Sequence, residues 1–373
     1  MSIDFIPFTS DKEEEWDRFC NQSDTAWFRH TRSFIEYTLA CKFDGNSREH
    51  SFFVYQDNHL VAIVPLVSQT VYGNEDKYEF ALYDTNMVFP AFLGNLGSQN
   101  YKNLCKLIFQ NIDEIAQKNN IARSRFFLDP LNPLSLSEKQ RFNPLLRYGY
   151  SDKSITTNII SLEYSAEELL GKVRKGHKAD IKSAQKGKYL VQIYSRENAL
   201  KTAFDIYRDI HFRDAGRKTR PDSSWNKMYE FIEKGLGQLS LVTDLETNLN
   251  ITGALLFTYK NAAYYASAAT LPEFAHTRGI GHLLQWETML FLKKNGVQYY
   301  ELGWNHFPVI SQEIGKEKDL GISRYKSGFG SDEYALFRGD RYFNKAFLRS
   351  KTAALLEEYI DTWMNKEATN IIE

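Results

Sequence analysis

"AAYYASAATLPEFAHTRGIGHLLQWETMLFLKKNGVQYYELGW" (residues 262–304) is the stretch that decides the fold. Residues 262–270 are small or aromatic and predict a β-strand. Residues 281–296 carry apolar side chains at helical spacing and end at Gly296, a residue type favoured just after a helix. Residues 297–304 predict the strand that follows. The order strand, loop, helix, strand indicates an α/β protein.

The same order of elements occurs twice along the chain. Before the stretch we expect a hairpin over 237–260, and in the first half a hairpin over 51–69, a helix over 100–120 and a strand over 124–130. The repetition lies in the order of elements rather than in the residues. We therefore expect one domain over 1–150, a second over 151–345, and a C-terminal helix over 346–373.

The composition is that of an ordinary globular protein. Of the 373 residues, 43% are apolar and 25% are charged, with a formal net charge of −1. This balance argues against a protein that binds DNA over its whole surface. The three cysteines, Cys20, Cys41 and Cys105, form no CxxC pair, which favours a reducing compartment and no metal site. We expect no signal peptide, no transmembrane segment and a cytoplasmic location.

The loop "HTRGIGHLL" (276–284) has the composition of an anion site. Glycine lets the backbone approach a bound group closely, and the amides at a helix N-terminus point at an anion. Arg278 adds a charged hydrogen-bond donor that suits a phosphate. The two glycines, Gly279 and Gly281, serve equally well in a tight turn that only packs the helix against the sheet. The residues alone leave these two interpretations open.

This loop resembles the donor loop of the GCN5-related N-acetyltransferase superfamily, which has the form Gln/Arg-x-x-Gly-x-Gly/Ala. His276 stands at the first position, where Gln or Arg is usual. The resemblance implies that the loop binds the pyrophosphate of coenzyme A. The donor-binding residues that it implies are His276, Arg278, Gly279, Ile280 and Gly281.

The wider stretch is similar to the second domain of the Fem-type aminoacyltransferases. Matching residues are Gln285-Trp286, Gly296 and Tyr300-Glu301-Leu302-Gly303, and downstream, within "ISRYKSGFGSD" (322–332), Tyr325, Lys326, Gly328, Phe329 and Gly330. The resemblance covers most of 155–345 and, more faintly, the first half. It implies two tandem acetyltransferase-like (GNAT-fold) domains with mixed central sheets flanked by helices.

The resemblance also implies the activity. The protein would move an acyl or aminoacyl group from acyl-CoA or aminoacyl-tRNA, neither being a permanently bound cofactor, to an amino group of a cell-envelope glycan or peptidoglycan precursor. Lys326 would stabilise the oxyanion that forms during acyl transfer. Without the resemblance, Lys326 reads as an exposed lysine beside a turn.

Two residues are candidates for the general base. His211 has a side chain whose usual pKa suits proton transfer, but it also fits a structural position on a helix at a domain interface. Glu301, on the strand after the donor helix, is placed to accept a proton from an attacking amine or to pair with an arginine. The sequence does not separate these alternatives.

We expect a helix around 165–188, and the basic stretch over 169–190 gives it a phosphate-binding face. Arg174, Lys178 and Lys182 follow i, i+4 spacing, and Asp180 is the only acid between Glu168 and Glu197. The apolar face of this helix would consist of Leu170, Val173, His177, Ile181 and Ala184. We expect Arg174, Lys178 and Tyr325 at a phosphate or at the acceptor, which includes a nucleotide- or lipid-linked glycan and possibly tRNA. A solvated helix face is the plainer interpretation.

The alternative function is a non-catalytic binding module. Such a protein would keep the fold and use its basic cleft to recognise RNA or phosphorylated glycans.

Overall fold

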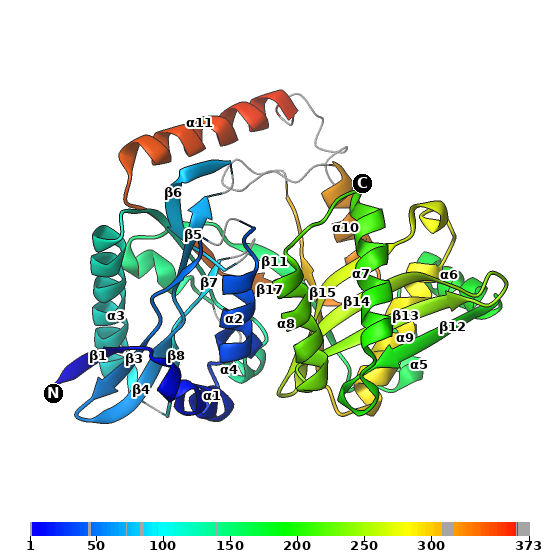
Figure 1. Ribbon diagram of the computed structural model, residues 1–373, viewed down its shortest axis with the longest axis horizontal. Coiled ribbons are helices and arrows are strands. Elements are labelled where there is room, and N and C mark those ends of the chain that lie inside the picture. The colour runs from blue at the N-terminus through cyan, green and yellow to red at the C-terminus, as the bar shows by residue number, and fades with distance from the viewer. Residues whose placement is uncertain are drawn as a thin grey trace. The chain divides into compact units, whose positions relative to one another are not determined.

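The structure, a computed structural model, describes residues 2–43, 46–71, 73–82, 86–94, 96–138, 141–307, 317–362 and 364 (Figure 1). The chain forms two compact units, Met1–Thr156 with Trp304–Ser323 and Ala335–Glu373, and Thr157–Gly303 with Arg324–Tyr334. The chain first passes from one unit to the other after Thr156, close to the boundary expected near residue 150. It passes between the units three more times, after Gly303, Ser323 and Tyr334. All three places lie inside the expected second domain.

The first unit contains two sheets, with orders β1-β3-β4-β8 and β10-β18-β9-β6-β5-β2, and β7 pairs with β9. Its strands are β1 (Ile3–Pro7), β2 (Arg48–Glu49), β3 (Phe52–Gln56), β4 (His59–Val64), β5 (Val67–Val71), β6 (Asn74–Phe80), β7 (Met87–Val88), β8 (Ala91–Phe92), β9 (Ile121–Phe127), β10 (Ser151–Asp152) and β18 (Arg338–Tyr342). Its helices are α1 (Glu13–Gln22), α2 (Arg32–Ala40), α3 (Ser98–Lys118), α4 (Pro133–Ser137) and α11 (Lys345–Thr362).

The hairpin expected over 51–69 forms only in part. β3 and β4 pair antiparallel around Asp57 and Asn58, whose φ angles of 47° and 66° are those of a tight hairpin turn. The second strand of the expected hairpin, however, divides into β4 and β5, which belong to different sheets. The break falls at Pro65, because proline has no N–H to donate to a strand ladder.

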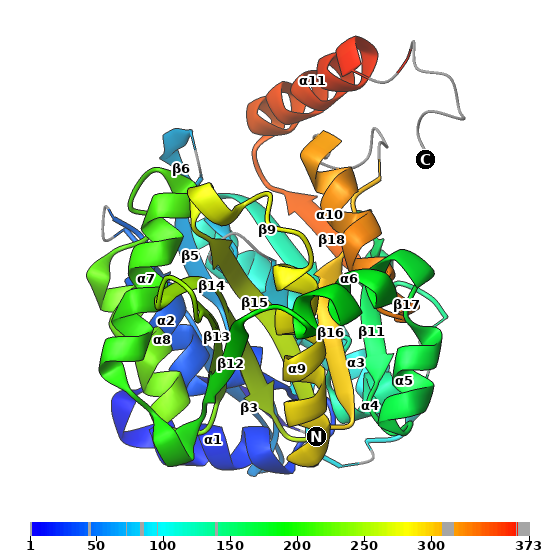
Figure 2. The same ribbon diagram turned by 90° about the vertical axis from the view of Figure 1, so that its right-hand side faces the viewer.

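The second unit is built on one mixed sheet of order β12-β13-β14-β15-β16-β11-β17 (Figure 2). Its strands are β11 (Ile155–Ser161), β12 (Tyr189–Tyr194), β13 (Gly237–Asp244), β14 (Leu249–Tyr259), β15 (Ala262–Thr270), β16 (Tyr299–Trp304) and β17 (Asp332–Leu336). Its helices are α5 (Ala166–Lys172), α6 (Lys175–Gln185), α7 (Lys201–Ala215), α8 (Asp222–Glu233), α9 (Ile280–Lys294) and the end of α10 (Glu317–Ser327).

Helices cover both faces of this sheet (Figures 1 and 2). On one face, the Tyr207 hydroxyl of α7 bonds to Ser267 of β15, and α8 packs against Phe257 of β14. On the other face, α9 packs against Leu256 of β14 through Met289. Since Leu256 and Phe257 are neighbours on one strand, their side chains point to opposite faces.

Two helices differ from the sequence expectation. The helix expected around 165–188 is divided into α5 and α6, because Val173 and Arg174 have extended ψ angles of 136° and 143°. The C-terminal helix is α11, which ends at Thr362. Residue 363 and residues 365–373 of that expectation lie outside the described residues.

The strands β15 and β16 part from each other in the middle of the sheet. They pair in parallel over Ala262–Tyr264 and Tyr299–Glu301. β15 continues to Thr270 and β16 to Trp304, but within the described range 262–304 no further pairing joins the two strands. We call this place the fork. In the first unit, the corresponding end of β9 pairs with β7 at Phe126 and Phe127. The second unit therefore has an opening between parallel strands at the position where the first unit has a paired strand.

Candidate active site at the fork

Lys326 reaches the fork from the last turn of α10. Its Nζ lies 2.9 Å from the point that a Cβ would occupy at Gly303, which has a φ of +100°. Glu301 and Gly303 are two residues apart on β16, so their Cβ directions share one face of the sheet. Because the Lys326 amine lies beside the Gly303 Cβ point, it lies on the same face as the Glu301 side chain.

Glu301 is fully buried at the fork. Its Oε1 accepts a hydrogen bond of 2.6 Å from Thr157 Oγ1 on the neighbouring strand β11. Tyr264, its partner on β15, marks the last pair before the strands part. The fork therefore brings together a carboxylate and an amine that the sequence placed 25 residues apart.

The donor loop is packed tightly against α6. Gly279 precedes α9 with a φ of +83°, and a Cβ there would lie 2.5 Å from the carbonyl oxygen of Asp180. Arg278 Nε donates to Asp180 Oδ1 at 2.6 Å, while 73% of the Arg278 side chain is exposed. His276 is exposed and Ile280 is buried. The expected donor residues therefore share one loop, and α6 fixes the position of that loop.

The first turn of α9 has the geometry of an anion site. The bond from Leu283 N to Gly279 O, 2.8 Å long, opens the helix, and Gly279 has no side chain to cap it. The amides of Ile280, Gly281 and His282 therefore precede the hydrogen-bonded turns, and amides at this place in a helix are suited to bind an anion. The Tyr325 hydroxyl lies 3.3 Å from the point that a Cβ would occupy at Gly281. This contact links the helix N-terminus to the residue before Lys326.

The sequence did not single out a pair of histidines beside the donor loop. His177 of α6 and His282 of α9 make edge-to-face contact with ring centroids 4.3 Å apart, and both touch Tyr325 and Phe329. Burial raises the pKa of Tyr325 well above its ordinary value, so the hydroxyl stays protonated. Of the two histidines, only His177 had a local signal in the sequence, its position on the apolar face of a helix. The sequence also contained Asp180, the lone acid of the basic stretch, which contacts the donor loop in the structure.

Acid is expected to destabilise the second unit through His282. Burial, and then the neighbouring His177, lower the pKa of His282 from 6.5 to about 4. Its neutral form is favoured on folding, so this stability is complete above pH 6.5 and is lost as the pH falls toward 4. Urea unfolding at about pH 7 and about pH 5 should show a loss about 2 kcal/mol larger for the wild type than for His282→Gln. His276→Gln, on the same loop, is the control, and equal losses in all three proteins would contradict the assignment.

The helix α6 presents a basic surface next to the donor loop. Arg174 precedes the helix and Lys178 follows one turn later, and their side chains are exposed and half-buried respectively. Lys178 Nζ donates to Gly171 O at 2.6 Å, and Arg174 Nη2 is 3.3 Å from His177 Nδ1. The expected apolar face is present in part, because His177, Ile181 and Ala184 are buried on α6, whereas Leu170 lies on α5 and Val173 at the break between α5 and α6.

His211 lies on α7, apart from the donor loop and α6 on the opposite face of the sheet. It contacts the rings of Tyr207 and Trp225, and Thr219 Oγ1 is 3.3 Å from its Nδ1. Burial, and then Arg220, lower the pKa of His211 to about 4. A general base works best with a pKa near the operating pH, so this environment favours a structural role over proton transfer.

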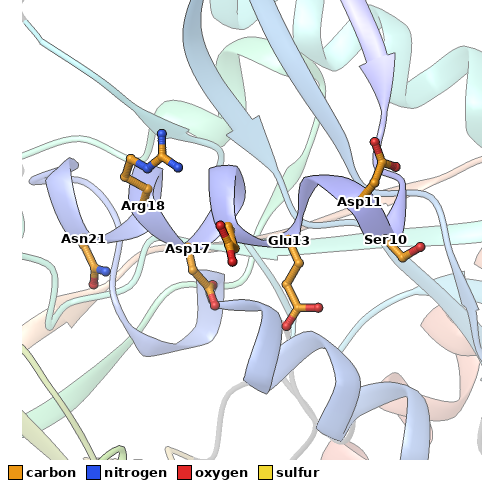
Figure 3. Close-up of a pocket in the computed structure, with 7 residues that line it drawn as sticks. Ser10, Asp11, Glu13, Asp17, Arg18 and Asn21 are labelled. Carbon is orange, nitrogen blue, oxygen red and sulfur yellow. The ribbon is translucent and has the colours of Figure 1, made fainter.

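An acidic hollow on the first unit differs in character from the fork. It has a volume of about 720 Å³ and is lined by Ser10, Asp11, Glu13, Glu14, Asp17, Arg18 and Asn21, which come from α1 and the turn before it (Figure 3). Asp17 also accepts a hydrogen bond from the backbone N of Arg32. Its four carboxylates repel a phosphate, so the hollow does not suit the donor.

Within the described residues, no group of three or more His, Cys, Asp or Glu side chains is arranged to hold a metal ion. In the same residues, each helix falls short of the combination of length and hydropathy that a bilayer span requires.

Part of the chain matches a known protein family. Residues 171–334, which contain the donor loop and Lys326, match the family described as "Acetyltransferase (GNAT) domain". No curated protein sequence matches the chain.

Solved structures show the same fold along the whole chain. The crystal structure of FemX has a TM-score of 0.60 and 15% identity, with 94% of this chain and 100% of that chain covered. A tandem GNAT protein from the clavulanic acid biosynthesis pathway has a TM-score of 0.55 and 10% identity, with 91% and 98% covered. The C-terminal domain of a putative lysylphosphatidylglycerol synthetase from Agrobacterium fabrum has a TM-score of 0.56 and 11% identity, with 93% and 96% covered. Residues 171–334 therefore form a GNAT domain of the kind found in acyltransferases, and the chain has a Fem-like double-domain fold.

Proposed function

We propose that the protein moves an acyl or aminoacyl group from acyl-CoA or aminoacyl-tRNA to an amino group of a cell-envelope glycan or peptidoglycan precursor. The observation that carries the proposal is the convergence at the fork. The N-terminus of α9 touches Tyr325, and the next residue, Lys326, ends beside Gly303 on β16. The start of a helix, which suits an anion, and a lysine amine beside the fork are therefore linked through two adjacent residues, and this supports the proposal.

The reaction needs only direct attack. The acceptor nitrogen forms a bond to the acyl carbon, and the bond from that carbon to the donor sulfur, or to the ribose oxygen of tRNA, breaks. The nitrogen loses one proton and the leaving atom gains one. The Lys326 ammonium stabilises the negative carbonyl oxygen of the tetrahedral intermediate. Glu301, on the same face, is our proposed proton acceptor.

The donor phosphates are proposed to bind at the start of α9. Asp180 holds Arg278 through Nε, and the guanidinium has four further N–H donors on its two Nη atoms. Arg174 and Lys178 of α6 extend the same positive surface. This arrangement fits the diphosphate of coenzyme A and also the backbone of a tRNA acceptor arm.

The acceptor class rests on similarity. The Fem-type motifs and the fold of FemX support an amino acceptor on an envelope precursor. The similar fold of the lysylphosphatidylglycerol synthetase domain supports an envelope acceptor more generally. The cytoplasmic face of the envelope is the location we propose for this reaction.

The test is a ligand screen followed by turnover. A donor at 100 times its Kd should raise the free energy of unfolding by about 2.7 kcal/mol. Coenzyme A, acetyl-CoA, deacylated tRNA and aminoacyl-tRNA are compared at low and high salt. For tRNA, each phosphate contact should contribute about 0.7–0.9 to the fall of log K with log salt. Arg278→Ala should weaken the true donor about tenfold, which is the effect of one charge-assisted hydrogen bond.

The matched control is Lys201→Ala. Like Arg278, Lys201 is a cation paired with a carboxylate, at 2.5 Å from Asp205, but it lies on α7, on the opposite face of the sheet from the donor loop. Its loss should leave donor binding unchanged. If no donor is bound or turned over, the acyltransferase proposal fails. If tRNA binds with a steep salt response but is never used, only the binding-module alternative survives.

A further inference from the structure

The turn that carries Lys326 is held by α6. Arg174 N donates to Gly328 O at 2.8 Å, and His177 Nε2 lies 2.9 Å from Tyr325 O. These two contacts lie on either side of Lys326 along the chain. Within the turn itself, Gly328 N bonds to Tyr325 O at 3.2 Å. The direction of the Lys326 side chain therefore depends on a helix that is about 150 residues earlier in the sequence.

The hydrogen bonds fix the protonation of His177. A guanidinium only donates, so the 3.3 Å contact from Arg174 Nη2 requires His177 Nδ1 to accept. The proton of the neutral ring is then on Nε2, which donates to the Tyr325 carbonyl. His177 is 5% exposed, so water does not compete freely for either nitrogen.

The imidazole also sits directly on Gly328. A Cβ at Gly328 would lie 2.3 Å from His177 Nε2. Any side chain at 328 would push the ring away from the Tyr325 carbonyl. Glycine at this position is therefore required by the approach of His177.

We propose that His177 is a positioning residue for Lys326: by donating from Nε2 to the Tyr325 carbonyl, it fixes the turn that aims the Lys326 amine at the acyl oxygen. The inference rests on the proposed acyl transfer. It predicts that loss of the hydrogen bond from His177 to the Tyr325 carbonyl lowers the rate of the chemical step and leaves the donor affinity unchanged, because the donor phosphates bind at the loop before α9.

The test compares His177→Gln with His177→Met. The two side chains have similar length, and only the glutamine keeps a donor near the position of Nε2. His177→Met should lower kcat about 10–100-fold with the donor KM within about threefold, since a small misplacement of a catalytic group costs that much. His177→Gln should stay within about threefold of the wild type. Backbone amides of 325–330 should exchange with solvent about tenfold faster in His177→Met only.

A second variant tests the same inference in case His177→Met does not fold. Gly328→Ala keeps the histidine and displaces it, and should show the same loss of kcat and the same faster exchange. Gly321→Ala, on α10 with open space around its Cβ, is the control and should leave both measurements unchanged. Wild-type levels of kcat and exchange in both His177→Met and Gly328→Ala overturn the inference while the proposed function stands. A wild-type protein that transfers no acyl group overturns both.

Discussion

Replacing Lys326 by methionine is expected to lower kcat about 10²–10³-fold, the effect of removing one donor from an oxyanion site. Methionine has a similar length and keeps the packing beside Gly303, but it has no charge. The donor KM should change little, because the phosphates bind at the first turn of α9. Steady-state kinetics with the donor found by the ligand screen measure both constants.

Arginine is not expected to restore the activity. The Lys326 amine already lies 2.9 Å from the Cβ point of Gly303, so the larger guanidinium has no room in the same place. Lys318→Ala, an exposed lysine at the other end of α10, is the matched control and should retain full kcat. A kcat for Lys326→Met within about threefold of the wild type would show that another group stabilises the oxyanion.

Gly279→Ala is expected to produce the second large effect, on donor binding and on stability together. A φ of +83° costs an alanine about 1–2 kcal/mol, and its Cβ would lie 2.5 Å from the Asp180 carbonyl. The loop must then move away from α6, which breaks the bond from Arg278 to Asp180. We expect the free energy of unfolding to fall by about 3 kcal/mol and the donor Kd to rise at least about tenfold.

Gly296→Ala separates the two causes. Gly296 follows the other end of the same helix with a φ of +80°, and no atom lies within 4 Å of its Cβ point. It should therefore cost only the backbone penalty of about 1–2 kcal/mol and leave donor binding intact. Equal losses of stability in the two variants, measured by urea unfolding, would mean that close contact of the loop with α6 is unimportant.

The sequence predicted the parts of the fold that depend on local pattern. The strand at 262–270, the helix ending before Gly296 and the strand at 297–304 are confirmed as β15, α9 and β16. The α/β class and the tandem GNAT fold are confirmed as well. These elements follow from residue spacing within short windows, and the residues that match family motifs lie within them.

The candidate site depended on contacts that no local window contains. The bond from Arg278 to Asp180 spans 98 residues, and the contact from His177 to Tyr325 spans 148. The sequence placed His177 correctly on a buried helix face, but the partner of that face was unknown. For the same reason Lys326 was expected beside a turn, whereas it lies in the last turn of a helix whose end is held by α6.

The short strand β7 has a consequence for how many donors one chain handles. It gives the end of β9 a partner, so the first unit repeats the architecture without the opening. Within the part of the chain that the structure describes, only the second unit has the fork. We therefore expect one donor molecule to bind for each pair of GNAT-like units, so that duplication of the fold would not double the number of reaction centres.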